Sequence, residues 1–274
     1  MQLLLFRHLW GVTDPWEVCF PRFETKGYHG IECPLPETHE QKRFLAQLHR
    51  HHFGYIADLS TTGSSVEDHV HSFRDQLRAA ARLKPRLANC HSGRDGWNES
   101  QSNEFFQAAL KIEEECGVPV AHETHRGRIL YNPWTTARLL KAFPRLKLSC
   151  DYSHWVCVCE RLLTGEEGIL RLCAENCLHI HARVGYEEGP QVPDPRAPEY
   201  AGQVRAHEGW WDLIWASQQK RGFKESSLTP EFGPPRYLHT LPYTDQPVAD
   251  LEAICDWQAA RQAERFTARL KGRR

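Results

Sequence analysis

The stretch "NCLHIHARVGY", from Asn176 to Tyr186, places the polar side chains of His179, His181 and Arg183 at every second position. Alternate side chains of a β-strand project from the same face. The three polar groups therefore share one face, and an apolar core does not accept such a face unless each group has a polar partner. The alternation predicts either an exposed strand or a strand whose inner face looks into a polar site.

Around this stretch, the chain alternates short β-rich runs with longer helical runs. Strands are predicted at residues 2–8, 29–33, 54–60, 86–92, 118–124, 146–152, 177–184 and 226–232. Helices are predicted at residues 36–52, 65–83, 98–117, 133–143, 155–175, 206–221 and 248–271. The segment between the first two strands is interrupted by Pro21. Strands that alternate with helices form a parallel sheet, because each crossover returns over the sheet.

Eight such units in 274 residues predict an α/β fold, a single (β/α)8 TIM barrel that forms one domain over residues 1–274. An open doubly wound sheet is the competing architecture. That fold usually carries a glycine-rich phosphate loop, and the sequence has no GxGxxG after the first strand and no P-loop. The longest irregular stretch, residues 185–202, follows the seventh strand, so a barrel would place it on the catalytic face.

The composition is typical of a soluble globular protein. With 34 Lys and Arg against 35 Asp and Glu, the formal charge of −1 provides no field that would attract nucleic acid or an anionic membrane. "MQLLLF" is too short for a signal peptide, and no stretch is apolar enough to span a bilayer, so we expect a cytoplasmic protein. The ten cysteines are scattered without a CxxC pair, and we expect them to be reduced and mostly buried.

Polar residues collect at the ends of five successive predicted strands. Those ends read "NCHSGRDGW", "AHETHRGR", "SCDYSHW", "HIHARVGY" and "TPEFGPPRY". In a barrel, functional groups lie at the carboxyl ends of the strands, which would bring Glu123, Asp151, His181 and Glu231 together. Three converging carboxylates repel one another unless a cation is present, and this mixed N/O set suits Mn²⁺, Mg²⁺, Co²⁺ or Zn²⁺. The alternative is that a neighbouring Arg or backbone amide satisfies each group separately.

The motifs "HET", "DYSH", "HIHAR" and "PEFG" resemble the xylose isomerase-like TIM-barrel superfamily. That superfamily includes sugar epimerases of the tagatose 3-epimerase type, hydroxypyruvate isomerase, inosose dehydratase and endonuclease IV. The resemblance implies that Glu123, Asp151, His181 and Glu231 hold a divalent metal ion. It also implies that His154, in the Asp-x-x-His motif, touches a substrate oxygen.

The chain departs from two branches of this superfamily. The epimerases carry a substrate-binding Arg beyond the strand-seven His, where this sequence has acidic residues near Glu187, and Arg183 is a possible substitute. Endonuclease IV needs three metals. His91 and His154 could stand in for two of its ligands, but Asp194 is followed by Pro and Arg, so an Asp-x-His pair is missing. We therefore expect a small carbohydrate-like substrate, no nucleic-acid partner and a possible homo-oligomer.

The predicted activity is a divalent-metal-dependent isomerisation or epimerisation of a small sugar or keto-sugar-like compound. Such a reaction removes a proton next to a carbonyl and passes through an enediolate that a metal ion stabilises. Glu123 and Glu231 would then be both ligands and proton-transfer groups. A metal-dependent lyase or dehydratase begins with the same step and remains an alternative, as do an endonuclease IV-like phosphodiesterase and a barrel that has lost catalysis.

Further side chains are predicted to surround the substrate. The predicted substrate-binding residues are His91, His125, His154, Trp155 and Arg183. His8 and Trp10 end the first strand and are candidates for the floor of the pocket. His179 shares the face of His181 but lies one step deeper, which predicts a supporting or packing role.

Overall fold

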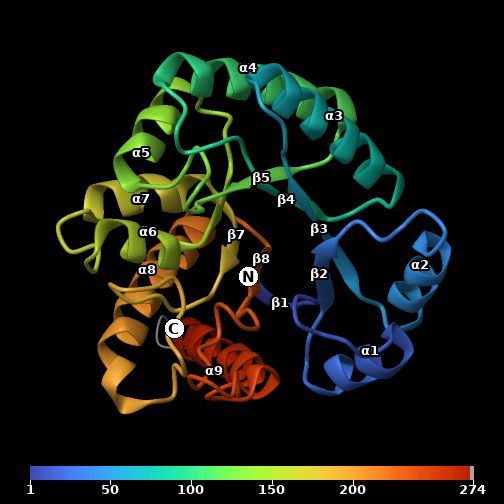
Figure 1. Ribbon diagram of the computed structural model, residues 1–274, viewed down its shortest axis with the longest axis vertical. Coiled ribbons are helices and arrows are strands. Elements are labelled where there is room, and N and C mark those ends of the chain that lie inside the picture. Colours follow the sequence, from blue (N-terminus) through green and yellow to red (C-terminus); the bar gives the residue numbers. More distant parts are fainter. Residues whose placement is uncertain (272–274) are drawn as a thin grey trace.

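Eight parallel strands close into one barrel in chain order in the computed structural model, which describes residues 1–271 (Figure 1). The strands are β1 (Gln2–His8), β2 (Gly30–Pro34), β3 (Gly54–Ser60), β4 (Leu87–His91), β5 (Val120–Glu123), β6 (Leu148–Cys150), β7 (Cys177–His181) and β8 (Glu225–Thr229). The (β/α)8 prediction is confirmed. Residues 272–274 of the predicted domain lie outside the described residues.

Helices surround the barrel on the outside (Figure 1). They are α1 (Trp16–Thr25), α2 (Gln41–Arg50), α3 (Val66–Arg82), α4 (Glu99–Cys116), α5 (Pro133–Ala142), α6 (Tyr152–Cys159), α7 (Glu167–Asn176), α8 (Ala201–Lys220) and α9 (Leu251–Lys271). A 3₁₀ turn at Pro198–Tyr200 precedes α8. Within residues 1–271, no helix is both long and hydrophobic enough to cross a bilayer.

The predicted helices differ from the structure in two segments. The segment before β2 contains α1, which includes Pro21 and nevertheless buries Phe20 and Phe23 against the core, so tertiary packing outweighs the hydrogen bond that proline removes. The single helix predicted at 155–175 is two helices. The first ends at Cys159 and is followed by Glu160, whose φ of 50° is left-handed, and Gly165 at φ 92° turns the chain before α7 begins.

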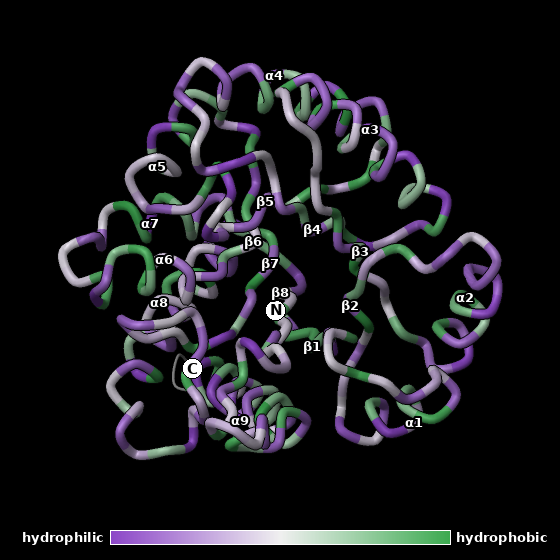
Figure 2. Tube along the Cα trace, viewed as in Figure 1, coloured by the Kyte–Doolittle hydropathy of each residue, from purple (hydrophilic) through white to green (hydrophobic). Residues whose placement is uncertain are grey.

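The inner face of the barrel changes character along each strand. At the amino ends, Leu4, Phe6, Ile56, Leu87 and Ala121 form a hydrophobic cluster separate from the larger core. Two positions farther along the same strands, the cluster gives way to polar groups, as side-chain alternation requires. Figure 2 shows the hydrophobic segments on the central strands.

Close packing at the amino end of the barrel leaves no room for a side chain at residue 30, which is a glycine. Gly30 lies opposite Phe6 in the register of β1 and β2, and a Cβ at residue 30 would come within 2.4 Å of the Phe6 ring. The barrel is therefore filled by side chains at its amino end. A small cavity of about 270 Å³ lies beside Leu4, Phe6 and Leu87 at this end, and a larger one of about 520 Å³ lies at the carboxyl end.

Candidate functional site

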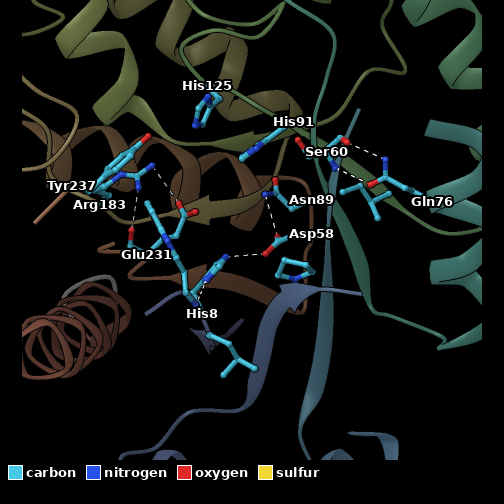
Figure 3. Close-up of a pocket in the computed structure, with 14 residues that line it drawn as sticks. His8, Asp58, Ser60, Gln76, Asn89, His91, His125, Arg183, Glu231 and Tyr237 are labelled. Atoms are coloured by element: carbon cyan, nitrogen blue, oxygen red, sulfur yellow. Dashed lines mark hydrogen bonds and ion pairs between the residues drawn. The ribbon is translucent and has the colours of Figure 1, made fainter. Parts of the chain in front are cut away.

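A cavity of about 520 Å³ lies at the carboxyl end of the barrel (Figure 3). Its wall is made by His8, Leu9, Trp10, Pro34, Asp58, Leu59, Ser60, Gln76, Asn89, His91, His125, Arg183, Glu231 and Tyr237. His8, Pro34, Ser60 and His91 are the last residues of β1 to β4. The predicted position of the site, at the carboxyl ends of the strands, thus coincides with a cavity large enough for a small ligand.

The four predicted metal ligands lie together beside this cavity. Glu123 ends β5, Asp151 follows β6, His181 ends β7, and Glu231 lies just beyond β8. Each offers one ligand atom, and the four atoms lie within 4.8 Å of one another. All four side chains are buried. Residues that are far apart in the sequence therefore converge on one point, which is the arrangement that the strand-end motifs predicted.

Within the described residues, the cluster holds three carboxylates beside one permanently charged group, the guanidinium of Arg183. The imidazoles of His181 and His91 are its other basic neighbours. Among residues 1–271, Glu123 Oε1 is buried and has no hydrogen-bond partner. A buried carboxylate oxygen without a partner is unfavourable, and a cation would satisfy it. The donor set of carboxylate oxygens and one imidazole nitrogen fits a hard or borderline divalent ion.

Glu32, on β2, orients His181, and the sequence reasoning missed it. Glu32 Oε1 lies 2.8 Å from Nε2 of His181, and its Oε2 accepts hydrogen bonds from Thr229 and, at 3.2 Å, from Nε2 of His179. The opposite nitrogen of His181, Nδ1, lies 2.6 Å from Glu231 Oε2. Burial raises the pKa of Glu32, but His181 and His179 outweigh it and hold that pKa well below its ordinary value. Glu32 thus directs Nδ1 of His181 at the cluster.

Asp151 is the member of the cluster that already has several partners. Its Oδ2 forms an ion pair with Arg183, and its Oδ1 accepts from the Ser153 amide at 3.0 Å and from the Ser153 hydroxyl. Burial raises the pKa of Asp151 to about 6 against the opposing effect of Arg183. Asp151 therefore matches the alternative considered from the sequence, in which a neighbouring Arg satisfies the carboxylate without a cation. Glu123, His181 and Glu231 each keep a buried side-chain atom without a hydrogen-bond partner among the described residues, and such atoms suit a cation.

The cavity wall includes three of the predicted substrate-binding residues, His91, His125 and Arg183. His91 Nε2 lies 2.8 Å from Glu123 Oε2, and its ring centroid is 4.4 Å from that of His125. Burial and the neighbouring His91 lower the pKa of His125 to about 3. His125 is therefore a neutral hydrogen-bonding group at ordinary pH. Arg183 extends from beyond β7 toward Glu231, with Tyr237 4.9 Å from its guanidinium (Figure 3).

His154 and Trp155 do not lie in the cavity wall. His154 is fully buried behind Arg183, with Nε2 2.8 Å from Nη2, so it supports the guanidinium in this geometry. The prediction that Trp155 contacts substrate is wrong: its ring is fully buried in the core, and its indole N–H donates to the Leu130 carbonyl at 2.9 Å. The helical packing of α6 decides this, because Trp155 faces the core from the first turn of that helix.

Aromatic residues from other segments take the predicted place of Trp155. Tyr237, in the loop after β8, and Trp10, after β1, line the cavity with ring centroids 4.9 Å apart. The predicted placement of His8 and Trp10 at the cavity agrees with this wall. Tyr237 closes the strand-end stretch "TPEFGPPRY", but no site role was predicted for it, because it lies in an irregular segment without strand or helix periodicity.

A polar pair on the opposite side of the cavity was also missed. His8 Nε2 lies 2.8 Å from Asp58 Oδ2, and the amide of Asn89 reaches Asp58 Oδ1 at 3.4 Å (Figure 3). The same amide donates to Glu123 Oε2 at 2.7 Å. Inward positions on β3 and β4, read by period two from Leu87 and Ile56, would have pointed to Asn89 and Asp58.

Known proteins share this fold and sequence pattern. Residues 20–198 match the family described as xylose isomerase-like TIM barrel. No curated protein matches the chain. A probable 3-DHS dehydratase from Bacillus anthracis, AsbF, has a similar structure, with a TM-score of 0.62, 13% identity, and coverage of 94% of this chain and 97% of that chain.

Two further solved structures are similar over nearly their whole length. The 3-keto-D-glucoside 4-epimerase YcjR from E. coli has a TM-score of 0.56 and 10% identity, and the match covers 95% of this chain and 98% of that chain. A xylose isomerase-like TIM barrel protein from Mycobacterium smegmatis, solved in complex with magnesium, has a TM-score of 0.57 and 9% identity, with 97% of each chain covered. At these identities the structures establish the fold, and the family match establishes that the chain belongs to the xylose isomerase-like TIM barrel family.

Proposed function

We propose that this protein is a divalent-metal-dependent enzyme that removes a proton next to a carbonyl of a small sugar or keto-sugar-like substrate and isomerises or epimerises it. The observation that carries the proposal is the buried convergence of Glu123, Asp151, His181 and Glu231 beside the cavity. A bound divalent cation supplies Lewis-acid polarisation of a carbonyl and stabilises the negative charge that develops when the neighbouring carbon loses its proton.

The cation would be held by Glu123, His181 and Glu231, whose free atoms face one point, and by Asp151 if Arg183 releases it. Glu231 also lines the cavity, which supports its assignment as the group that takes a proton from a bound substrate. Glu123 lies deeper, behind Asn89 and His91, and would reach only the innermost part of the substrate. Removal and return of a proton require a base and an acid, and these two carboxylates are the candidates for those roles.

The remaining wall fits a polyhydroxylated substrate. His91 and His125 present imidazole nitrogens, and Ser60, Gln76 and Asn89 add neutral polar groups. Arg183 is positively charged and stacked on Tyr237, which suits a substrate oxygen that becomes negative. Similar solved structures include a 3-keto-D-glucoside 4-epimerase, which supports a carbohydrate-like ligand.

A lyase or dehydratase remains the second candidate, because it begins with the same proton removal. The His8–Asp58 pair is the observation that favours it, since that pair offers a second acid–base group across the cavity. A similar solved structure is a probable 3-DHS dehydratase.

Heavy-water exchange tests the proposed function without knowledge of the product. A panel of ketoses, keto-inositols and keto-glycosides is incubated with the Mn²⁺-loaded protein in heavy water, and deuterium uptake at the carbon beside the carbonyl is followed by NMR. We expect uptake with at least one substrate, and we expect a chelator to abolish it. Glu231→Gln should lower the exchange rate about 10²–10⁴-fold, the usual contribution of a positioned base.

Glu188→Gln is the matched control, because Glu188 is exposed in the loop after β7 at the same end of the barrel. It should exchange at the wild-type rate. Exchange that persists in a Glu123→Gln, Glu231→Gln double variant would remove this mechanism. The absence of exchange across the whole panel, together with an absence of metal binding, would remove the proposed function.

A further inference from the structure

The pair formed by His8 and Asp58 is the second titratable centre of the cavity. Both residues line the cavity, on the ends of β1 and β3, away from the strands that supply the metal cluster. His8 Nε2 and Asp58 Oδ2 lie 2.8 Å apart. Neither residue is needed to hold a cation, and neither belongs to the cluster of four. A buried imidazole–carboxylate pair beside a ligand cavity calls for a functional explanation.

The backbone fixes which of the two groups can exchange a proton. The Trp10 amide donates to His8 Nδ1 at 2.8 Å, so this nitrogen is an acceptor and the ring proton is on Nε2, facing Asp58. Both nitrogens of His8 are thus engaged. Asp58 Oδ1 has only a long contact, 3.4 Å, from Asn89 and remains available to a substrate. His8 therefore orients Asp58, and Asp58 is the group that meets the ligand.

Asn89 sets the spacing between Asp58 and the metal cluster. Its amide nitrogen lies 3.4 Å from Asp58 Oδ1 and 2.7 Å from Glu123 Oε2, so these two oxygens can be no farther apart than the sum of the two distances. Neighbouring atoms of one small molecule can span such a gap. A substrate whose carbonyl carbon lies at the cluster would place an oxygen on a nearby carbon within reach of Asp58.

The protonation state of Asp58 suits an acid as well as a base. Burial raises its pKa to about 6, with His8 opposing the rise and Glu32 adding to it. A carboxyl group with such a pKa holds its proton in a useful fraction of molecules near neutral pH. This behaviour supports the geometric argument.

We propose that Asp58, oriented by His8, is a second proton-transfer carboxyl of the site and protonates a hydroxyl that leaves from the carbon next to the one that loses its proton. This inference rests on the first step of the proposed function, the removal of a proton next to a carbonyl, and favours the second candidate reaction, dehydration of a β-hydroxy ketone or aldehyde. Glu231 takes the proton from the carbon beside the carbonyl, and the electron pair of that bond forms a C=C bond. The C–O bond on the next carbon breaks with its electron pair, and the Asp58 proton completes a water molecule.

The step balances without an oxidant or reductant. Glu231 ends with one additional proton and Asp58 with one fewer, and exchange with solvent restores both. An epimerase has no leaving hydroxyl and needs no acid at this position. A requirement for the acid of Asp58 therefore distinguishes dehydration from epimerisation, the two candidate reactions that share the first step.

The test compares two rates in Asp58→Asn, which keeps the size of the side chain and removes its acid. The Mn²⁺-loaded protein is incubated in heavy water with the panel of ketoses and keto-inositols, and NMR follows deuterium uptake and loss of water separately. We expect the variant to keep Mn²⁺ binding and deuterium uptake while water loss falls about 10²–10⁴-fold. Asp95→Asn, at an exposed loop position after β4, is the matched control and should behave as wild type.

Three outcomes overturn the proposal. The first is water loss at the wild-type rate in Asp58→Asn, and the second is an equal fall of uptake and water loss with Mn²⁺ still bound. The third is wild-type uptake without water loss on every substrate, which contradicts this inference and leaves the proposed function standing. If Asp58→Asn fails to fold, His8→Gln serves instead, with the same selective loss of the second step expected. A wild-type protein without uptake contradicts the proposed function itself.

Discussion

The two ends of the barrel are built on the same strands and differ in almost every physical property. At the amino end, Leu4, Phe6, Ile56 and Leu87 fill the interior with apolar side chains. At the carboxyl end, the same strands present His8, Asp58 and Asn89 to a cavity. Burial of apolar surface stabilises the first region, whereas the second holds buried charges that weigh against stability unless they are paired. The comparison indicates that the apolar amino end stabilises the fold, whereas the carboxyl end carries the groups to which we assign the proposed reaction.

Of the substitutions that test this comparison, Glu123→Gln at the carboxyl end is expected to lower activity the most. Glu123→Gln removes the charge of a buried group that is in contact with His91 and Asn89 and close to His181. Activity should fall about 10²–10⁴-fold because a ligand and a proton-transfer group are lost together. Steady-state kinetics on any substrate found by the exchange screen would measure the fall. A variant that retains wild-type kcat/KM would show that Glu123 has no part in the reaction.

The converse effect is expected at the amino end. Phe6→Ala removes a buried ring that packs against Leu4 and Ile56, and such a change lowers the free energy of unfolding by about 3–5 kcal/mol. Urea unfolding would measure it. Mn²⁺ affinity in native buffer should stay at the wild-type value, and a large loss of affinity would mean that the two ends are not independent. Leu178→Ala, at a partly buried neighbour, provides a milder control.

A smaller effect is expected at the residue that orients His181. Glu32→Gln keeps the shape but removes the acceptor charge that faces Nε2 of His181 and of His179. Mn²⁺ affinity should fall about 10–100-fold, the usual size of an effect from groups that support a ligand. Calorimetric titration would measure the affinity, with Ser227→Ala as a control, because Ser227 contacts only His179 of these two histidines. Equal affinities for Glu32→Gln and wild type would show that His181 does not depend on Glu32.

The smallest effect concerns the loop that follows β7. His207 on α8 accepts a hydrogen bond from the Gly185 amide at 3.2 Å, and burial lowers its pKa to about 4. The folded state therefore resists protonation that the unfolded state accepts below its ordinary pKa of about 6.5, so stability falls as pH decreases from about 6.5 to 4. The slope should be at most about 1.4 kcal/mol per pH unit.

Urea unfolding over this pH range compares His207→Gln with wild type. The variant should show a shallower slope, while His71→Gln, at an exposed position of α3, should match wild type. Identical slopes for His207→Gln and wild type would mean that another group dominates the acid sensitivity.

The sequence predicts the barrel well because alternating strands and helices leave few other architectures. The clustering of Glu123, Asp151, His181 and Glu231 follows from their positions at strand ends, since the barrel closes and brings those ends together. That convergence needs only the period of the elements and no detailed packing. Whether these residues bind a metal ion remains a proposal.

The failures have physical causes in packing. Trp155 is adjacent to His154 in sequence, but both are fully buried, and only tertiary contacts decide that its ring packs in the core. The break between α6 and α7 depends on a left-handed turn at Glu160, a conformation that is uncommon for a residue other than glycine. Tyr237 belongs to an irregular segment, where hydrophobic periodicity does not predict which side chains face the cavity.

Direct measurement of metal binding tests the central claim. Purified protein is stripped with a chelator and titrated with Mn²⁺ by calorimetry, beside the Glu123→Gln, Glu231→Gln double variant. We predict one bound ion per wild-type chain and none in the double variant, because the variant removes two of the four converging carboxylate and imidazole groups. Absence of binding to wild type, or the same binding to both proteins, would contradict the account.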